Sequence, residues 1–361
     1  MIRNYIKVAL RNILRYKIFA FINIAGLVIG MTACLLILLF IKNELSYENM
    51  HGDLEKMHRV LTIDKALGTN NQRVGITMPG LGPAIATNFP EVEATHRLTF
   101  GSQTLLKYQD RLAIYANQLR SADANFFSFF DYPLLIGNPA TVLESPYSIV
   151  LTETLAHQIF GNEEAVGQTL TAGGGYDMLV TGIMADLPEN THLEFDALQS
   201  ISTITANANP NQPPFLESWQ IIAMPTYVKF REAIDPKPFD EKFTQLCRDN
   251  NVAPNFDITL QPLSRTHLWS TDVIFDPVAN KGDNNNIYIF GAIAVLILII
   301  ASVNYINLST ARSAQRAKEV GLRKVVGSSR SQLLLQFITE SLLISGIALL
   351  LVLPLAQLAT P

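Results

Sequence analysis

The sequence predicts a membrane protein that combines a bundle of transmembrane α-helices with a large mixed α/β domain of two subdomains outside the cytoplasm. Three apolar runs, 18–41, 287–308 and 333–359, carry this prediction, because each is long enough for a helix to cross a hydrocarbon core of about 30 Å. Only 16% of the residues are charged, which is unusual for a soluble chain of this length. The stretch 42–286, between the first two runs, suffices for a folded domain with its own core.

Residues 1–17 predict an amphipathic helix in the headgroup region of a membrane. Basic residues recur at every fourth position and form one stripe on a helix: Arg3, Lys7, Arg11 and Arg15. The alternative is the charged leading region of a signal peptide. The run that follows, 18–41, contains no charged residue. It is much longer than the roughly 7–15 apolar residues of a signal peptide, so it favours a first span.

Charge is distributed unevenly along the chain, although the formal net charge is only −4. Both 1–17 and the segment 309–332, between the second and third runs, are strongly basic, so the residues between the first two runs are acidic. Short basic segments beside membrane spans remain in the cytoplasm. This places the amino terminus inside and 42–286 outside, and such sorting by compartment argues against nucleic-acid binding.

Within 42–286, apolar alternation and turn signals predict a mixed α/β domain, with about 109–216 inserted as a second subdomain. Strands are expected at 57–63, 97–108, 112–119, 146–151, 176–184, 223–230 and 256–262, and helices at 78–88, 124–130, 152–160 and 238–249. The polar stretch 207–212 is expected to be a loop between the subdomains. The clearest local signals are Thr152 as a helix cap and Gly161 as the stop of the same helix.

A search for catalytic chemistry in this domain finds no supporting motif. The chain contains no G-x-x-x-x-G-K-[ST], H-E-x-x-H, C-x-x-C or G-x-S-x-G pattern, so nothing indicates a phosphate-binding loop, a zinc site or a nucleophile. His192, Glu194 and Asp196 could present metal ligands on one side of a strand, but alternation in an exposed edge strand explains them equally well. We therefore expect no catalytic residue, no metal and no cofactor of its own.

Two features of the spans concern a helix contact and a polar side chain within the membrane. Gly26 and Gly30 form a G-x-x-x-G pair, which lets a second helix approach closely. Glu340 lies about two turns into the third run, where an acid is costly unless it is paired or reaches water. We expect its carboxylate to extend toward the inner membrane boundary.

The basic segment between the second and third runs is the most strongly patterned part of the chain. It holds six Arg or Lys residues and a single acid, Glu319, and it is predicted to be cytoplasmic. Within it, 317–327 is expected to form a short helix closed by Gly327, and Ser328 or Ser329 is expected to cap the next helix. The alternative is that these charges only set the topology.

Six stretches carry a resemblance to a known family. They are ALRNILRYKIFAFINIAGLVIGM at 9–31, NELSYENMH at 43–51, FFSFFDYPLLIGNP at 126–139, LTETLAHQIFGNEEAVGQTL at 151–170, QPLSRTHLWS at 261–270 and NYINLSTARSAQRAKEVGLRKVVGSSRSQLLLQFITES at 304–341. By these stretches the chain resembles, over essentially its whole length, the FtsX/MacB-type permease subunits of ATP-binding-cassette systems. The last stretch is the most specific, because E-V-G-L-R-K-x-x-G between two spans is hard to obtain by chance.

The resemblance implies a multi-pass permease of the bacterial inner membrane, with its amino terminus in the cytoplasm and a MacB-like domain at 42–286 in the periplasm. The family has four spans per unit, so a fourth span, and a second similar half, are expected to be missing from this chain. A helix in the cytoplasmic loop docks on a separate ATPase dimer, which binds the ATP. Carried over residue by residue, this coupling element comprises Arg316, Lys318, Glu319, Val320, Gly321, Leu322, Arg323, Lys324 and Gly327.

The implied function is that of a non-enzymatic subunit that transmits motion from the ATPase to the periplasmic domain. Its cargo would be a lipoprotein, a peptide or a small toxic compound, and its partners a cytoplasmic ATPase dimer, a second permease copy or half, and a periplasmic or outer-membrane protein. Glu319 and Arg323 are four apart, so they share a helix face and can pair. The alternative is a membrane receptor with a ligand-binding outer domain. A receptor would need a cytoplasmic output domain, whereas only the short segment 309–332 separates the second and third runs.

Overall fold

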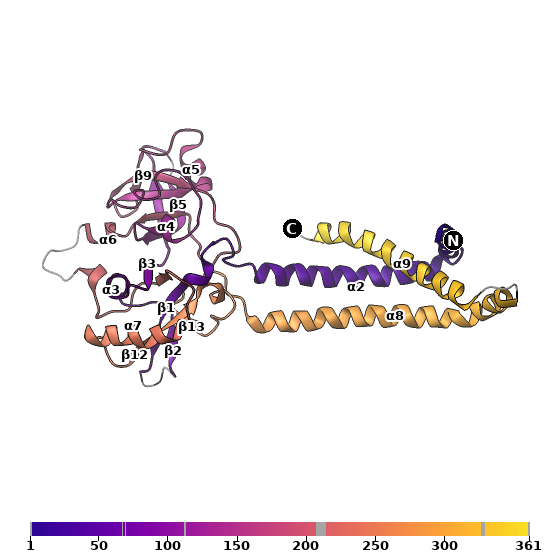
Figure 1. The fold of residues 1–361 in the computed structure, drawn as a ribbon. Helices are drawn as coiled ribbons and strands as arrows, with labels where there is room; N and C mark the ends of the chain where they lie inside the picture. Colours follow the sequence, from indigo (N-terminus) through magenta and orange to yellow (C-terminus); the bar gives the residue numbers. More distant parts are fainter. Residues whose placement is uncertain are drawn as a thin grey trace. The chain divides into compact units, whose positions relative to one another are not determined.

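A computed structural model describes residues 2–66, 68, 70–111, 113–206, 214–325 and 329–359. The chain divides into two compact units (Figure 1). The first, here called the membrane unit, comprises Met1–Leu45 and Asn285–Pro361, and the second, the outer domain, comprises Ser46–Asn284. The predicted loop at 207–212 lies outside the described residues.

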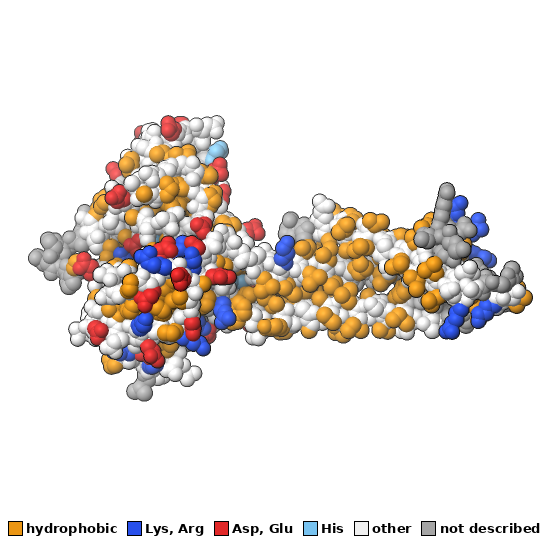
Figure 2. All heavy atoms as spheres, in the orientation of Figure 1, with side chains coloured by type: hydrophobic (Ala, Val, Ile, Leu, Met, Phe, Trp, Pro, Cys, Tyr) orange, Lys and Arg blue, Asp and Glu red, His pale blue; other side chains and the backbone are white. Residues whose placement is uncertain are grey.

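Within the described residues, the membrane unit consists of four helices: α1 (Ile2–Arg15), α2 (Lys17–Glu44), α8 (Asn284–Val325) and α9 (Arg330–Ala359). Three of them are long and apolar enough to cross a membrane, over Lys17–Glu44, Asn284–Ala311 and Arg330–Ala359. Figure 2 shows hydrophobic side chains covering the long helices along their length. The prediction of three apolar spanning helices is therefore confirmed.

Small residues bring α2 and α8 close together. A β-carbon built on Gly30 would lie 2.7 Å from the β-carbon of Ala301 in α8, and one on Gly26 would lie 3.2 Å from Nδ2 of Asn304. Real side chains do not approach to 2.7 Å, so only glycine fits at position 30. The G-x-x-x-G pair therefore serves the close helix contact that the sequence suggested.

The buried residues of α9 lie on one face of the helix and recur mostly at every fourth position. They are Leu333, Gln336, Glu340, Ile344, Ala348, Val352 and Ala356. This spacing forms a ridge along one side of the helix, and α9 packs against both α2 and α1. In addition, the Tyr305 hydroxyl of α8 donates to Oγ of Ser341 in α9 at 2.8 Å.

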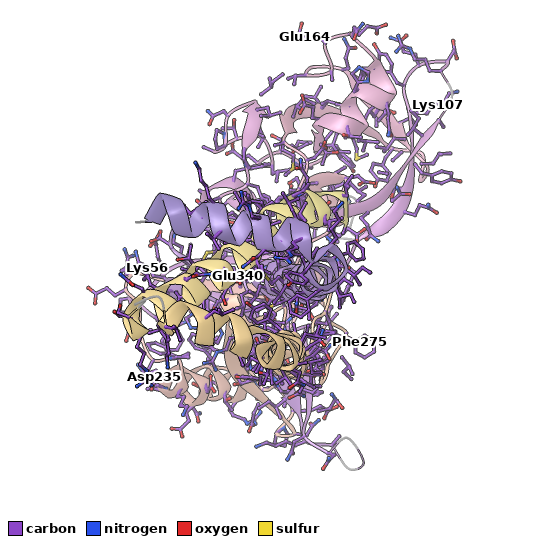
Figure 3. All side chains as sticks on the ribbon, turned by 90° about the vertical axis from the view of Figure 1, so that its right-hand side faces the viewer. Lys56, Lys107, Glu164, Asp235, Phe275 and Glu340 are labelled. Carbon is purple, nitrogen blue, oxygen red and sulfur yellow. The ribbon has the colours of Figure 1, made fainter. Side chains whose placement is uncertain are left out.

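The expectation that Glu340 reaches the membrane boundary is wrong. The residue is only 5% exposed and lies among the helices of the membrane unit (Figure 3). Its position on the buried ridge of α9, one turn after Gln336 and one turn before Ile344, points it into the helix packing. Depth along a span predicts the distance to water, but it does not predict which way a side chain faces.

The first sheet of the outer domain is formed by the two ends of that domain. Its strands are β1 (Met57–Asp64), β2 (Gln72–Val74), β3 (Val92–Arg97), β11 (Thr226–Phe230), β12 (Phe256–Pro262) and β13 (Val273–Ile274). Their order is β13-β2-β1-β11-β3, and β12 pairs along β1. Helices α3 (Leu81–Asn88) and α7 (Lys237–Asp249) contact β3 and β12, and they help to enclose a core that includes Phe230, Phe243 and Leu260.

The second sheet is formed by the middle of the chain. Its strands are β4 (Ser102–Lys107), β5 (Ile114–Ala122), β6 (Leu134–Ile136), β7 (Ser148–Thr152), β8 (Thr169–Ala172), β9 (Asp177–Met184) and β10 (Ala197–Ser200). The order is β6-β9-β7-β10-β5-β4-β8, and β8 pairs back onto β9, so all of these strands except β6 close into a ring. Apolar residues from the ring strands, together with α5 (Glu153–Phe160), form one core.

Three local predictions here agree closely with the structure. Oγ1 of Thr152 accepts a hydrogen bond from the amide of Leu155 at the start of α5, and Gly161 ends the helix with φ +66°. The strand expected at 176–184 is β9, which pairs antiparallel with β8. The predicted strand at 97–108 differs, because the structure has two strands, β3 and β4, on either side of Gly101.

The two sheets share an aromatic core. Short helix α4 (Phe126–Phe129) lies in a cluster that contains Met57 and Tyr227 of the first sheet and Val150 and Met184 of the second. The strands of the second sheet span 102–200, so β4 precedes the predicted insertion at about 109–216. Short elements complete the domain: η1 (Leu54–Lys56), α6 (Thr203–Ala206), η2 (Phe215–Glu217) and η3 (Leu263–Arg265).

Candidate functional site

The coupling element predicted from the sequence lies at the end of one long helix. Helix α8 continues through Ser309 without interruption and ends at Val325. We expected a separate short helix beginning at Ala317. The segment 309–316 contains Ser, Thr, Ala, Arg and Gln but no Pro or Gly, so nothing in it ends the second span. The element is thus a direct extension of that span.

Most of the described side chains at this end of α8 are exposed. Leu322 is 65% and Val325 is 88% exposed, Lys324 is also exposed, and Val320 is half-buried. A β-carbon on Gly321 would meet nothing within 4 Å. Two large apolar side chains facing away from the packed helices at one helix end suggest a surface that another protein covers.

Other predicted residues cannot be placed in the same detail. Positions 319 and 323 fall in the helical backbone, so their four-residue spacing does put them on one face. The side chains of Arg316, Lys318, Glu319 and Arg323 lie outside the described part of the structure, as does Gly327. The pairing of Glu319 with Arg323 therefore stays a prediction.

The turn into α9 is fixed by a reciprocal cap. The amide of Gln332 donates to Oγ of Ser329 at 3.4 Å, and the amide of Ser329 donates to Oε1 of Gln332 at 3.1 Å. This is a capping box, which satisfies two amides that the helix start leaves free. Of the two serines that the sequence offered as caps, Ser329 takes this role.

The basic amino-terminal segment is helical, as predicted. In α1, Lys7, Arg11 and Arg15 are exposed, whereas Ala9 is buried, and α1 contacts α9 and α2. The side chain of Arg3 lies outside the described residues. An exposed row of basic side chains opposite a buried small residue fits a helix at an anionic surface, and this location stays a prediction.

The alternating residues His192, Glu194 and Asp196 do not converge. They lie in a loop before β10, not in a strand. His192 is fully buried and its Nδ1 lies 3.0 Å from Oε1 of Glu48, whereas Glu194 is exposed and Oδ2 of Asp196 accepts from the amide of Asn117 at 2.7 Å. Across the described residues, no group of three or more His, Cys, Asp or Glu side chains is arranged to hold a metal ion.

Sequence reasoning missed a buried ionic cluster built around Glu48. Its Oε2 lies 3.3 Å from Nε2 of His51, and Nε2 of His192 lies 2.9 Å from the Tyr227 hydroxyl. Burial raises the pKa of Glu48, but the imidazoles of His192 and His51 more than offset this and lower it from 4.5 to about 2. Burial also raises the pKa of Tyr132 beside the cluster. The stretch NELSYENMH contains Glu48 and His51, but no local pattern links it to a histidine so distant in the sequence.

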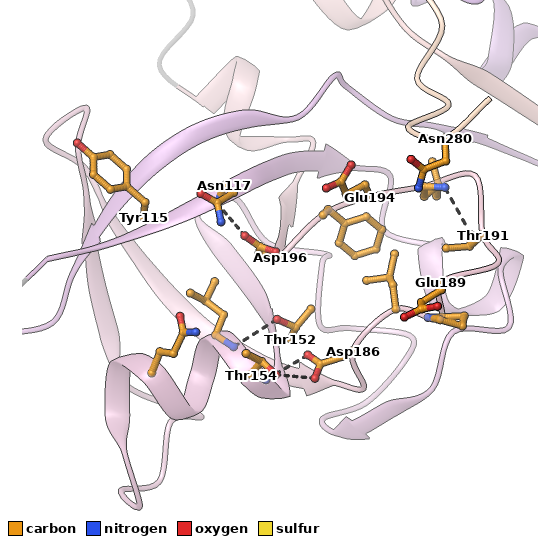
Figure 4. Close-up of a pocket in the computed structure, with 16 residues that line it drawn as sticks. Tyr115, Asn117, Thr152, Thr154, Asp186, Glu189, Thr191, Glu194, Asp196 and Asn280 are labelled. Atoms are coloured by element: carbon orange, nitrogen blue, oxygen red, sulfur yellow. Dashed lines mark hydrogen bonds between the residues drawn. The ribbon is translucent and has the colours of Figure 1, made fainter. Parts of the chain in front are cut away.

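A cavity of about 480 Å³ opens beside the loop that carries His192 (Figure 4). Four carboxylates line it, those of Asp186, Glu189, Glu194 and Asp196, and no basic side chain does so among the described residues. Asp186 accepts from the amide and hydroxyl of Thr154 at 3.1 and 2.6 Å. Such a lining is suited to small polar or cationic molecules, and it contains no nucleophile–base pair.

Comparison with known proteins gives two matching families. Residues 20–246 match the MacB-like periplasmic core domain, and residues 291–361 match the FtsX-like permease C-terminal region. The chain is 29% identical over 196 residues to the macrolide export ATP-binding/permease protein MacB of Bdellovibrio bacteriovorus, covering 54% of this chain and 28% of that protein. MacB of Salmonella typhimurium is 20% identical over 268 residues, or 73% of this chain and 37% of that protein. The chain thus spans well under half the length of these relatives.

Among solved structures, the chain is similar to a crystallised domain of a proposed permease protein from Porphyromonas gingivalis. The two share 20% sequence identity at a TM-score of 0.50, over 59% of this chain and 92% of that domain. At this identity the likeness concerns the fold alone. It supports the mixed α/β architecture described above.

Proposed function

Because this chain belongs to the family of MacB-like periplasmic core domains and carries an FtsX-like permease region, we propose that it couples ATP hydrolysis by a separate cytoplasmic ATPase to motion of its outer domain. It is a permease of the FtsX/MacB type in ATP-binding-cassette systems. The proposal concerns what drives the permease, what it moves and which residues take part.

The observation that supports coupling most directly is the continuity of α8. Its 42 residues form one rod, about 63 Å long at 1.5 Å per residue. The predicted docking residues occupy one end of this rod, and the second span occupies the rest. A displacement applied at Leu322 would therefore reach the span without passing through a flexible joint.

The exposed apolar residues at this end favour a protein partner. Leu322 and Val325 would seat on the ATPase, while the basic residues around them would meet its acidic groups. These 361 residues contain no phosphate-binding loop motif, and we assign ATP binding and hydrolysis to that partner. The curated relatives are named as ATP-binding/permease proteins, and an ATPase joined to the same chain would dock in the same way.

The proposed product of this coupling is the export or extraction of a lipoprotein, a peptide or a small toxic compound at the bacterial inner membrane. The amino terminus and the coupling element would lie in the cytoplasm, and a second permease copy or half would complete the assembly. A cysteine introduced as Leu322→Cys tests this topology. Labelling of that cysteine by an impermeant thiol reagent in intact cells would overturn it.

The decisive experiment is co-purification of the full-length protein with ATPases from neighbouring reading frames, followed by measurement of ATPase stimulation. We expect the double variant Glu319→Ala/Arg323→Ala, and separately Leu322→Asp/Val325→Asp, to lose stimulation while membrane insertion stays normal. The control is Ser331→Asp, an exposed position beyond the element. Unaltered stimulation in both double variants would argue against the coupling role.

One observation favours the alternative of a membrane receptor, namely the cavity in the outer domain. A receptor would respond to a ligand in that cavity without any ATPase. The same co-purification separates the two functions, because a receptor would stimulate none of the candidate ATPases and would retain a regulator or kinase as its partner.

A further inference from the structure

Two chain segments connect the outer domain to the spans. The segment 46–52 follows directly on α2, and 279–284 leads directly into α8. The two segments therefore stand at opposite ends of the outer domain's sequence. Within the outer domain, both are tied to the same short loop, 190–192.

The segment after α2 is attached to this loop by several hydrogen bonds. The amide of Glu48 donates to the carbonyl of Asn190 at 3.0 Å, and Nδ2 of Asn190 donates back to the carbonyl of Ser46 at 3.0 Å. The amide of His192 donates to Oε1 of Glu48 at 2.5 Å. The loop therefore holds both the backbone and the side chain of the segment.

The segment before α8 is attached to the other side of the same residue. The amide of Ala279 donates to the carbonyl of His192 at 3.1 Å. A second connection runs through His267, whose ring stacks on that of Tyr47 with centroids 3.4 Å apart. His267 also accepts at its carbonyl from the amide of Gly282 at 3.0 Å, and its Nδ1 lies 2.7 Å from the carbonyl of Asn280.

The centre of this arrangement is buried and charged. Glu48, His51 and His192 are each at most 3% exposed, and Glu48 adopts φ +64°, a left-handed conformation that a non-glycine residue keeps only where its surroundings fix it. A buried carboxylate that loses its partners is left without solvation. The contacts of Glu48 are therefore expected to form or break together.

We propose that Glu48, Asn190, His192 and Ala279, together called the clasp, form the joint through which displacement of the first and second spans moves the outer domain. This inference rests on the proposed function, and it names the residues at which motion of the spans would pass to the outer domain. Glu48 and His192 are positioning residues, because they hold the two span-connected segments in one register. Since His192 contacts both segments, neither can shift without moving the loop.

Hydrogen exchange tests the clasp without any ATPase. In the full-length protein in lipid nanodiscs, Glu48→Ala should accelerate amide exchange at least tenfold in 46–52 and also in 279–284. The second segment is tied to the loop at the carbonyl of His192, which accepts from the amide of Ala279. Asn190→Ala, a milder change, should raise exchange in the same two segments to a smaller extent. Faster exchange confined to 46–52 in both variants would overturn the clasp.

A matched control removes a comparable interaction elsewhere. Nη2 of Arg97 lies 2.9 Å from Oδ1 of Asp123 in a largely buried pair outside the clasp. Asp123→Asn should leave exchange in 46–52 and 279–284 unchanged. The conservative variant Glu48→Gln keeps an oxygen that can accept from the amide of His192, and it should restore most of the protection lost in Glu48→Ala.

A pair of distance measurements then connects the clasp to function. Spin labels at Ile18→Cys and Ile306→Cys report on the membrane unit, and labels at Leu350→Cys and Tyr115→Cys report on the outer domain relative to α9. All four sites are exposed, whereas the native Cys34 and Cys247 are buried. With the partner ATPase present, ATP should change both distances in the otherwise unaltered protein.

The clasp variants should separate the two distances. In Glu48→Ala or His192→Ala, ATP should still change the first distance but no longer the second, and in Asp123→Asn it should change both. If both distances respond in the clasp variants, the clasp does not transmit the motion. If neither responds in the unaltered protein, the proposed function fails, while the exchange experiment still decides whether the clasp ties the two segments together.

Discussion

Gly30 of α2 lies so close to Ala301 of α8 that a β-carbon added to the glycine would stand 2.7 Å from that of the alanine. The first and second spans therefore touch at their backbones, as small residues allow in lipid, where packing contributes much of the association between helices. This contact fixes the distance between the two helices that frame the outer domain in the sequence.

Gly30→Leu should force α2 and α8 apart. Overpacking of this kind costs about 1–3 kcal/mol, and we expect a lower thermal midpoint of the purified protein in detergent. Gly346→Leu is the matched control, because a β-carbon on Gly346 meets nothing within 4 Å. Equal midpoints for the two variants would contradict the close contact.

Ser329→Ala should loosen the start of α9. The variant removes the hydroxyl that accepts from the amide of Gln332, and loss of such a cap costs about 1 kcal/mol. Hydrogen exchange at 330–333 should accelerate, while exchange near Ile344 should not. Ser331→Ala is the control, since the hydroxyl of Ser331 lies 3.1 Å from that of Ser329 and caps no amide among the described residues. The prediction fails if both variants exchange alike.

The outer domain should lose stability in acid partly through Glu48. Its folded pKa, about 2, lies below the ordinary value of 4.5. The ionised Glu48 carboxylate therefore contributes its full share to the folding stability above about pH 4.5, and this share is lost as the pH falls toward 2. A shift of this size corresponds to about 3 kcal/mol. Asp53 acts in the same direction, because its hydrogen bonds to Lys229 and Lys56 lower its pKa to about 2.

Unfolding of the outer domain followed by circular dichroism between pH 5 and 2 checks this expectation. Glu48→Gln should be less stable at pH 5 and should lose less stability on acidification, because glutamine does not titrate. Glu163→Gln, at a half-exposed site, should keep the original slope. A slope in Glu48→Gln as steep as in the unaltered protein would exclude this role.

Arg59→Met should be the most destabilising of these changes. Nη1 of Arg59 donates to Oδ1 of Asp276 at 2.5 Å, Nε donates to Gln261, and Nη2 donates to Ser270. Both charged side chains are only 2% exposed. Removing one partner of a buried pair costs about 3–5 kcal/mol.

Arg111→Met provides the comparison. Arg111 pairs with Glu163 at a site where the two side chains are 42% and 52% exposed, and such surface pairs contribute about 0–1 kcal/mol. Chemical denaturation monitored by Trp fluorescence should separate the two variants clearly. Similar midpoints would mean that the burial of Arg59 has no energetic consequence.

Elements defined by neighbouring residues could be predicted from the sequence. Thr152 and Gly161 bound α5, Ser329 caps α9, and the three apolar runs are helices, because each of these depends on residues within a few positions. The family could also be identified, since motifs such as E-V-G-L-R-K are contiguous. The prediction of a separate short helix beginning at 317 is wrong. The charges of 309–325 suggest a loop, but no residue in 309–316 ends a helix.

Features that depend on distant contacts were not predicted. His192 was grouped with Glu194 and Asp196 by spacing, whereas its partners are Glu48 and Tyr227, which lie on other elements. The burial of Glu340 follows from the ridge of α9 that packs on α2, and no local pattern encodes which face that will be. Ring closure of β9 onto β8 and β7 likewise requires the strand order, which periodicity alone does not give.

The loop 190–192 has neighbours of two kinds. Thr191, between Asn190 and His192, lines the acidic cavity, as do Leu193 and Asn280. Asn190 and His192 are hydrogen-bonded to the segments that lead to the spans. Binding free energies at two sites that share a moving part are reciprocal. A molecule that binds the cavity more tightly when the loop is displaced would shift the equilibrium toward the displaced loop. Displacement of the loop would in turn raise the affinity of the cavity for that molecule by the same factor. The affinity measured at the cavity would therefore report the state of the transmembrane helices.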